Sequence, residues 1–189
     1  MLEELVRLDK ELFLFLNHLG NPSWDGFWLF ITDKWSAIPL YLLLAIITYR
    51  VFGLKQLLLV LGSMALLILA TDQLANFFKY GVQRFRPCYD LEIGESVRLV
   101  KASCGGKFGY FSAHAGNSFA VATFFTLLLG AKLRALGVFL VVWAMVVAYS
   151  RIYIGVHFPL DILTGALVGS GMASIFYQLF IRVRDRYNI

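Results

Sequence analysis

Charged residues are scarce in this chain of 189 residues: Asp, Glu, Lys and Arg make up only 15% of it. Soluble globular domains carry about 25% charged and about 45–50% apolar residues. Here the hydrophobic share is 59%, so too few charges remain to cover a solvated exterior. The composition therefore argues against a soluble protein and favours one that is surrounded by lipid.

Strict alternation of polar and apolar residues, which marks the strands of a membrane barrel, is also missing. Instead, long apolar runs recur, and roughly 17–25 apolar residues suffice for a helix to cross a bilayer. We expect an all-α, polytopic membrane bundle of about five transmembrane helices. The predicted spans are residues 35–51, 56–77, 113–131, 136–149 and 158–181, of which the short fourth span should extend at both ends.

Residues 1–34 lack such a run. The stretch LVRLDKELFLFLNHLG mixes charge and leucine at helical spacing, and NPSWDG then breaks it. Glu3, Glu4, Asp9 and Glu11 stand where a secretory signal would have a basic region and an apolar core. We expect residues 1–34 to form one or two amphipathic helices at the membrane interface. Residues 35–189 would then form the transmembrane domain.

The basic residues predict an orientation. If the spans alternate in direction, Arg50 and Lys55 share a side with Arg134 and with the basic C-terminal tail. The positive-inside rule makes that side cytoplasmic. The segment 79–111 would then lie outside, although it also holds six cations, and an anionic ligand would explain them. These six are Lys79, Arg84, Arg86, Arg98, Lys101 and Lys107.

The chain has only two cysteines, Cys88 and Cys104, and both lie in this outer segment. Outside the cytoplasm, an even pair that closes a short loop indicates a disulfide. Two free thiols are the alternative, which the spacing does not decide. No zinc-binding pattern accompanies the pair.

Lys79 and Arg86 are seven residues apart, which is two helical turns, at the outer end of the second predicted span. Both side chains would therefore share one face and could converge on one point. Pro87 favours an extended backbone at Arg86. Alone, the two cations could equally be a pair that reaches from a helix end toward water.

Ser112, Ala113 and His114 open the third predicted span. Serine is a favoured N-cap, and the free backbone N–H groups of a helix N-terminus, including that of Ala113, form an anion site. Taken alone, this segment could also be an ordinary cap with a nearby histidine.

His157 and Asp161 lie four residues apart, after Arg151, between the last two spans. On one helical face the carboxylate can accept the imidazole N–H, which leaves the other ring nitrogen free to attack or to take a proton. The alternative is a polar pair that fills the end of the bundle. All three segments fall on the same predicted face of the membrane and together supply cations, a nucleophile and an acid, as phosphoryl transfer requires.

In this order the segments resemble the type 2 phosphatidic acid phosphatase (PAP2) family, whose pattern is K-x6-R-P, P-S-G-H and S-R-x5-H-x3-D. The first and third motifs match completely. In the second, Phe111 replaces the family's proline and Ala113 its glycine. The resemblance covers the chain from about residue 55 onward.

The resemblance implies a metal-independent phosphomonoester or diphosphate hydrolase with a phosphohistidine intermediate. His157 would attack phosphorus, and Asp161 would orient the imidazole of His157. His114 would protonate the leaving oxygen and later activate water. The residues implied to hold the phosphate are Lys79, Arg86, Ser112, Ala113 and Arg151.

A site at the membrane surface suits a lipid phosphate held in the bilayer rather than a nucleic acid. We favour a phosphatase of the bacterial inner membrane with its site on the periplasmic face, acting on undecaprenyl diphosphate or a related lipid. A lipid A phosphatase is the alternative, and a non-enzymatic transporter or flippase is the rival of another class. Transporters generally show repeated halves with broken helices at the midplane, whereas the charges here gather at one surface. The oligomeric state stays open.

Overall fold

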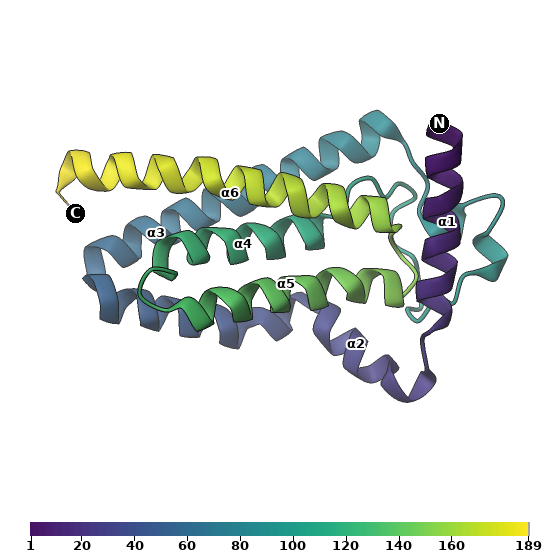
Figure 1. Ribbon diagram of the computed structural model, residues 1–189, viewed down its shortest axis with the longest axis horizontal. Helices are drawn as coiled ribbons and strands as arrows, with labels where there is room; N and C mark the ends of the chain where they lie inside the picture. The colour runs from purple at the N-terminus through teal and green to yellow at the C-terminus, as the bar shows by residue number, and fades with distance from the viewer. Residues whose placement is uncertain (189) are drawn as a thin grey trace.

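The computed structural model describes residues 1–188, which form a bundle of long helices with one helix lying across its end (Figure 1). Within these residues there is no strand, only an isolated bridge between Phe85 and Phe108. The all-α prediction is therefore confirmed. The α-helices are α1 (Leu2–His18), α2 (Asp25–Thr32), α3 (Ile38–Val82), α4 (Ala113–Leu129), α5 (Arg134–Tyr153) and α6 (Pro159–Tyr187).

In the described part of the chain, three helical segments are long and apolar enough to cross a membrane: Lys34–Val82, Arg134–Tyr153 and Pro159–Tyr187. The backbone of Gly53 (φ 83°, ψ 179°) interrupts α3. Its two halves run in opposite directions (Figure 1), so α3 supplies two passes. The fourth predicted span does extend at both ends, as α5. The protein is an integral membrane helical bundle.

The central helix α4 is apolar but has only 17 residues. At about 1.5 Å per residue it measures about 26 Å, less than the hydrocarbon core of about 30 Å. Its N-terminus starts short of the end at which α5 finishes and α6 begins (Figure 1), and the N-cap Ser112 is fully buried. Small residues bring α4 against α6: a Cβ added at Gly165 would lie 2.6 Å from the carbonyl oxygen of Ser112, and one at Gly169 would overlap the carbonyl of Gly116.

Helix α1 lies across the end of the bundle at which α6 begins (Figure 1). Its buried face is formed by Asp9, Phe13 and Asn17, which are four residues apart. The Asn17 side-chain amide donates to the carbonyls of Ile152 and Tyr153, at 3.0 and 3.1 Å. Most of the other apolar side chains of this segment are exposed, whereas Leu14 and Leu16 are partly buried. This arrangement suits a helix that turns its apolar stripe to lipid and its polar positions to the protein. The exposed apolar residues are Leu2, Leu5, Leu8, Leu12, Phe15 and Leu19.

The segment between α3 and α4 also covers this end of the bundle. A disulfide joins Cys88 and Cys104, whose Cα atoms are 6.4 Å apart. Arg98 pairs with Asp25 of α2 at 2.6 Å, and its backbone N–H donates to the Asn17 side chain at 2.9 Å. The segment is thus cross-linked internally by the disulfide and bound to the N-terminal helices by the contacts of Arg98.

Candidate active site

The two cations of the first motif reach the site from different secondary structure, one from a helix and the other from the loop after it. Lys79 is in the last turn of α3, which ends at Val82, and Gln83 then adopts a left-handed conformation. Arg86 follows with φ −71° and ψ 158°. The predicted shared helical face is therefore wrong, because the helix ends between the two residues. The extended backbone expected before Pro87 is confirmed.

Two backbone carbonyls hold the guanidinium of Arg86. Its Nε donates to Phe108 and its Nη1 to Cys104, both at 3.2 Å. Gly109 packs directly beside it: a Cβ at this glycine would lie 3.0 Å from Cγ of Arg86 and 3.3 Å from Oδ2 of Asp161. Only a residue without a side chain lets the loop approach both groups this closely.

His157 and Asp161 form a buried pair. His157 lies in the short turn between α5 and α6, and its Nδ1 is 3.3 Å from Oδ2 of Asp161 in the first turn of α6. The same oxygen accepts from the backbone N–H of Phe158 at 3.1 Å. His157 is 2% exposed and Asp161 fully buried. With Nδ1 oriented by the carboxylate, Nε2 is the ring nitrogen left to react.

Arg151 carries an incomplete set of partners. It is 5% exposed, and its Nη1 donates to the hydroxyl of Thr32 at the end of α2. Its Nε is buried without a hydrogen-bond partner. A buried, unsatisfied guanidinium N–H is costly unless a ligand pairs with it, and an anion such as phosphate is the partner that it suits best.

Positive charge surrounds His157. Burial lowers the pKa of His157 well below its usual value, and the charges of Arg151, Arg86 and Lys79 lower it further. Burial likewise lowers the pKa of Arg86, although the charge of Asp161 opposes this. The imidazole is therefore neutral at pH 7, the form that can act as a nucleophile. Cations that repel its protonated form would attract a phosphate dianion.

The second motif opens α4 as predicted. Ser112 is the N-cap, and its hydroxyl accepts from the backbone N–H of Ala115 at 3.5 Å. Ala113 is the first helical residue, so its N–H has no partner within the helix. His114 lines a largely apolar cavity of about 650 Å³ between α3, α4 and α5. Lys79, Arg151 and His157 lie close enough to His114 to act on it electrostatically.

Three residues to which sequence reasoning assigned no individual role also lie at this site: Lys101, Arg84 and Asp9. Lys101 lines a hollow of about 500 Å³ together with Arg86 and Arg151. Arg84 pairs with Asp161 at 3.0 Å and with Asp9 at 2.5 Å. The sequence did contain signals for two of them. Arg84 is a further cation two residues before Arg86, and Asp9 is one of two polar residues, with Asn17, that lie eight positions apart on the buried face of α1. Within residues 1–188, no three His, Cys, Asp or Glu side chains group as metal ligands.

The sequence model of the PAP2 superfamily matches residues 55–185, and the chain belongs to this superfamily. A lipid A 4'-phosphatase of Bacteroides thetaiotaomicron is 36% identical over 98% of this chain and 83% of its own length. A lipid A 4'-phosphatase of Porphyromonas gingivalis is 33% identical over 98% of this chain and 78% of its own length. An undecaprenyl-diphosphatase of Sulfolobus acidocaldarius is 26% identical over 94% of this chain and 81% of its own length.

Two crystal structures are similar. LpxE of Aquifex aeolicus superposes with a TM-score of 0.63 and 28% identity over 89% of this chain and 93% of that one. A transmembrane PAP2-type phosphatidylglycerolphosphate phosphatase of Bacillus subtilis superposes with a TM-score of 0.74 over 95% of this chain and 88% of that one. At 19% identity, this similarity concerns the fold alone.

These comparisons make the protein a membrane PAP2 lipid phosphatase, and hence a phosphoric monoester hydrolase rather than a transporter. They favour lipid A phosphatase, our alternative, over undecaprenyl diphosphatase, because the undecaprenyl-diphosphatase relative is the more distant in sequence. The three motifs cannot discriminate between these lipids, since the role that the family resemblance implies for them is to bind the phosphate common to all these substrates.

Proposed function

We propose that the protein is a lipid A phosphatase, which removes a phosphate monoester from the sugar headgroup of lipid A in the inner membrane. The observation that carries this proposal is the position of His114, which borders both the cationic cluster around His157 and the apolar cavity of about 650 Å³. A ligand at this junction needs a phosphate at one end and hydrocarbon at the other. The 4' position is suggested by two relatives that bear this name and match nearly the whole chain.

The proposed reaction begins with attack of His157 Nε2 on phosphorus. The N–P bond forms as the bond from phosphorus to the sugar oxygen breaks. His114, protonated when the anionic substrate binds beside it, gives this proton to that oxygen and becomes neutral. Water, deprotonated by His114, then cleaves the phosphohistidine and releases inorganic phosphate. Asp161 holds the imidazole through Nδ1 and stabilises the charge that develops on it.

The phosphate oxygens would meet the chain's own cations and amides. Arg151 offers its unpartnered Nε, Arg86 and Lys79 add charge, and the N-terminus of α4 offers the backbone N–H of Ala113. The Ser112 hydroxyl is engaged in the helix cap, so its contribution would be to place that N-terminus. No step in this scheme requires a metal ion.

The lipid chains would lie in the cavity beside His114. Its wall is formed mostly by apolar residues of α3, α4 and α5, and Thr32, Asp33 and Lys34 stand at the end that precedes α3. Since α4 is short, the phosphate can sit at headgroup level while the chains remain at the depth of the hydrocarbon. We place this end of the bundle on the periplasmic side.

Phosphate release by the purified protein tests the proposal. Hexa-acylated lipid A, undecaprenyl diphosphate and phosphatidylglycerol phosphate are compared in excess chelator, with mass spectrometry to locate the phosphate lost. We expect the highest kcat/KM for lipid A, with loss from the 4' position, and no turnover by His157→Ala. Faster hydrolysis of undecaprenyl diphosphate would overturn the choice of substrate. Turnover by His157→Ala, or a requirement for Mg²⁺, would overturn the mechanism.

A further inference from the structure

A chain of ion pairs connects the N-terminal helix α1 to the proposed nucleophile. Asp9 of α1 is 5% exposed, and its Oδ2 accepts from Arg84 Nη2 at 2.5 Å. Arg84 Nη1 donates in turn to Oδ1 of Asp161 at 3.0 Å. The other oxygen of Asp161 faces His157 Nδ1 at 3.3 Å. One guanidinium therefore bridges two buried carboxylates, and the second of these orients the imidazole.

Further contacts fix this bridge in place. The Oδ1 atom of Asp9 accepts from the backbone N–H of Leu160 at 2.9 Å, in the first turn of α6. The guanidinium of Arg84 lies over the ring of Phe158, 4.2 Å from its centroid. That ring packs edge-on against Phe13 of α1 at 5.3 Å. Both oxygens of Asp9 are thus used, one on the arginine and one on the helix that carries Asp161.

A simple structural ion pair does not account for this arrangement. Burial raises the pKa of Asp9, and hydrogen bonding from Arg84 opposes the shift. Burying a second carboxylate against one arginine costs desolvation energy, which a single Arg84–Asp161 pair would avoid. With Asp9 present, the guanidinium is held from both sides and cannot rotate away from Asp161. Its charge is also divided between two carboxylates, so Asp161 keeps more of its ability to accept the N–H of His157.

We propose that Asp9 is a positioning residue for the phosphatase reaction, acting through Arg84 on Asp161 and thereby on His157. Helix α1 is then part of the catalytic apparatus as well as an interfacial helix. This inference rests on the proposed role of Asp161 in orienting the nucleophile.

Asp9→Asn keeps the size of the side chain and removes its charge. We expect kcat to fall roughly tenfold with KM changed less than about twofold, because Asp9 touches no substrate; effects of this size are usual within one hydrogen-bond network. Lys10→Gln is the matched control, since Lys10 is the next residue of α1 and pairs with Asp90 and Glu92 of the outer segment at 2.9 and 2.7 Å. It should keep wild-type kcat. Equal losses in both variants would mean that only the docking of α1 matters, and would overturn the inference.

A double-mutant cycle separates positioning from general loosening. In an Asp161→Asn background, Asp9→Asn should lower kcat less than about twofold further, because its path to His157 is already broken. Losses that multiply would overturn the inference. If Asp9→Asn fails to fold, Arg84→Gln is measured in its place, and wild-type kcat in that variant would likewise overturn it. Full activity in Asp161→Asn alone would instead contradict the proposed mechanism from which the inference starts.

Discussion

At the scale of single residues, the site depends on side chains that use some of their hydrogen-bonding atoms on the protein and leave others for the substrate. Arg151 is nearly fully buried, yet its Nε has no hydrogen-bond partner. His157 turns Nδ1 toward Asp161, so Nε2 is the nitrogen that would react. Each group is thus held by protein through one nitrogen and has a second nitrogen with which phosphate would interact. Such preorganisation stabilises charge in a transition state without reorganisation during the reaction.

Replacing Arg151 by lysine tests this geometry separately from charge. Lysine keeps the positive charge but has a single donor nitrogen in place of the planar fork, so it cannot place donors at the separate positions of Nη1, which meets the Thr32 hydroxyl, and Nε. We expect kcat/KM to fall roughly 10²–10³-fold, as when one transition-state donor is lost. Steady-state kinetics in detergent micelles measure the change. Near wild-type kcat/KM would show that charge alone suffices.

The pKa of His157 also predicts how stability depends on pH. Because burial lowers this pKa in the folded protein, the unfolded chain takes up a proton below about pH 6.5 while the folded protein does not. The stability contributed by neutral His157 is therefore complete above about pH 7 and declines as the pH falls below about 6.5. Melting temperatures of wild type and His157→Gln should converge or cross between pH 7.5 and 5.5. A constant difference would contradict the prediction.

At the scale of secondary structure elements, the position of α4 matters most. This short helix lies at the centre of the bundle, and its N-terminus carries the second motif below the surface. Glycines set its distance from α6, which begins with Asp161 in its first turn. Helix packing thus decides how near the first turns of α4 and α6 come to each other.

Gly169→Ala should disturb this contact. The added Cβ would overlap the carbonyl of Gly116 on α4, and forced overpacking of this kind costs about 1–3 kcal/mol. Gly171→Ala, two residues later on α6, meets nothing within 4 Å and should be neutral or stabilising by about 0.5–1 kcal/mol. Thermal unfolding in detergent compares the two. Equal melting temperatures would show that α4 can shift without loss.

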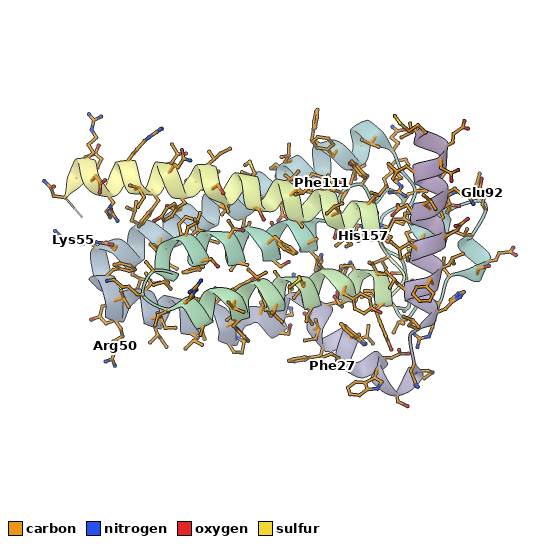
Figure 2. All side chains as sticks on the ribbon, viewed as in Figure 1. Phe27, Arg50, Lys55, Glu92, Phe111 and His157 are labelled. Atoms are coloured by element: carbon orange, nitrogen blue, oxygen red, sulfur yellow. A yellow bond between two sulfur atoms is a disulfide. The ribbon has the colours of Figure 1, made fainter. Side chains whose placement is uncertain are left out.

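At the scale of the whole molecule, the charges are divided between the two ends of the bundle. Figure 2 places Arg50 and Lys55 at the end opposite to His157. The C-terminus lies at the same end as Arg50 and Lys55 (Figure 1). The positive-inside rule therefore predicts that the end with His157 is the outer one, as we propose. At that end the charges of Arg151, Arg86 and Lys79 act on His157, whereas Arg98 pairs with Asp25.

Cysteine labelling tests this orientation. In a background without Cys88 and Cys104, single cysteines replace the exposed residues Glu95, in the outer segment, and Lys132, between α4 and α5. An impermeant thiol reagent added to intact spheroplasts should label the first, while the second should require permeabilised membranes. The reverse pattern would place the site on the cytoplasmic side.

Much of the fold could be predicted because the relevant forces are local or act on composition. Apolar runs must be helical in a bilayer, where every backbone group needs a partner within its own segment. The boundaries of α4 and the extension of α5 followed from caps and span length. The reversal within α3 at Gly53 lies in the gap that the sequence left between its first two predicted spans.

The sequence by itself determined that this is a helical membrane protein, and it predicted that His157 and Asp161 would meet, because they are only four residues apart. They do meet, but His157 precedes Phe158, the N-cap of α6, so the contact crosses the start of the helix and is not made on one helical face. Only the tertiary structure decided that Arg86 reaches the site from a loop, that Arg84 bridges two carboxylates, and that Asp9 takes part at all. The physical reason is distance along the chain. Asp9 and Arg84 are 75 residues apart, and their contact exists only because α1 packs across the end of a bundle that the other helices build.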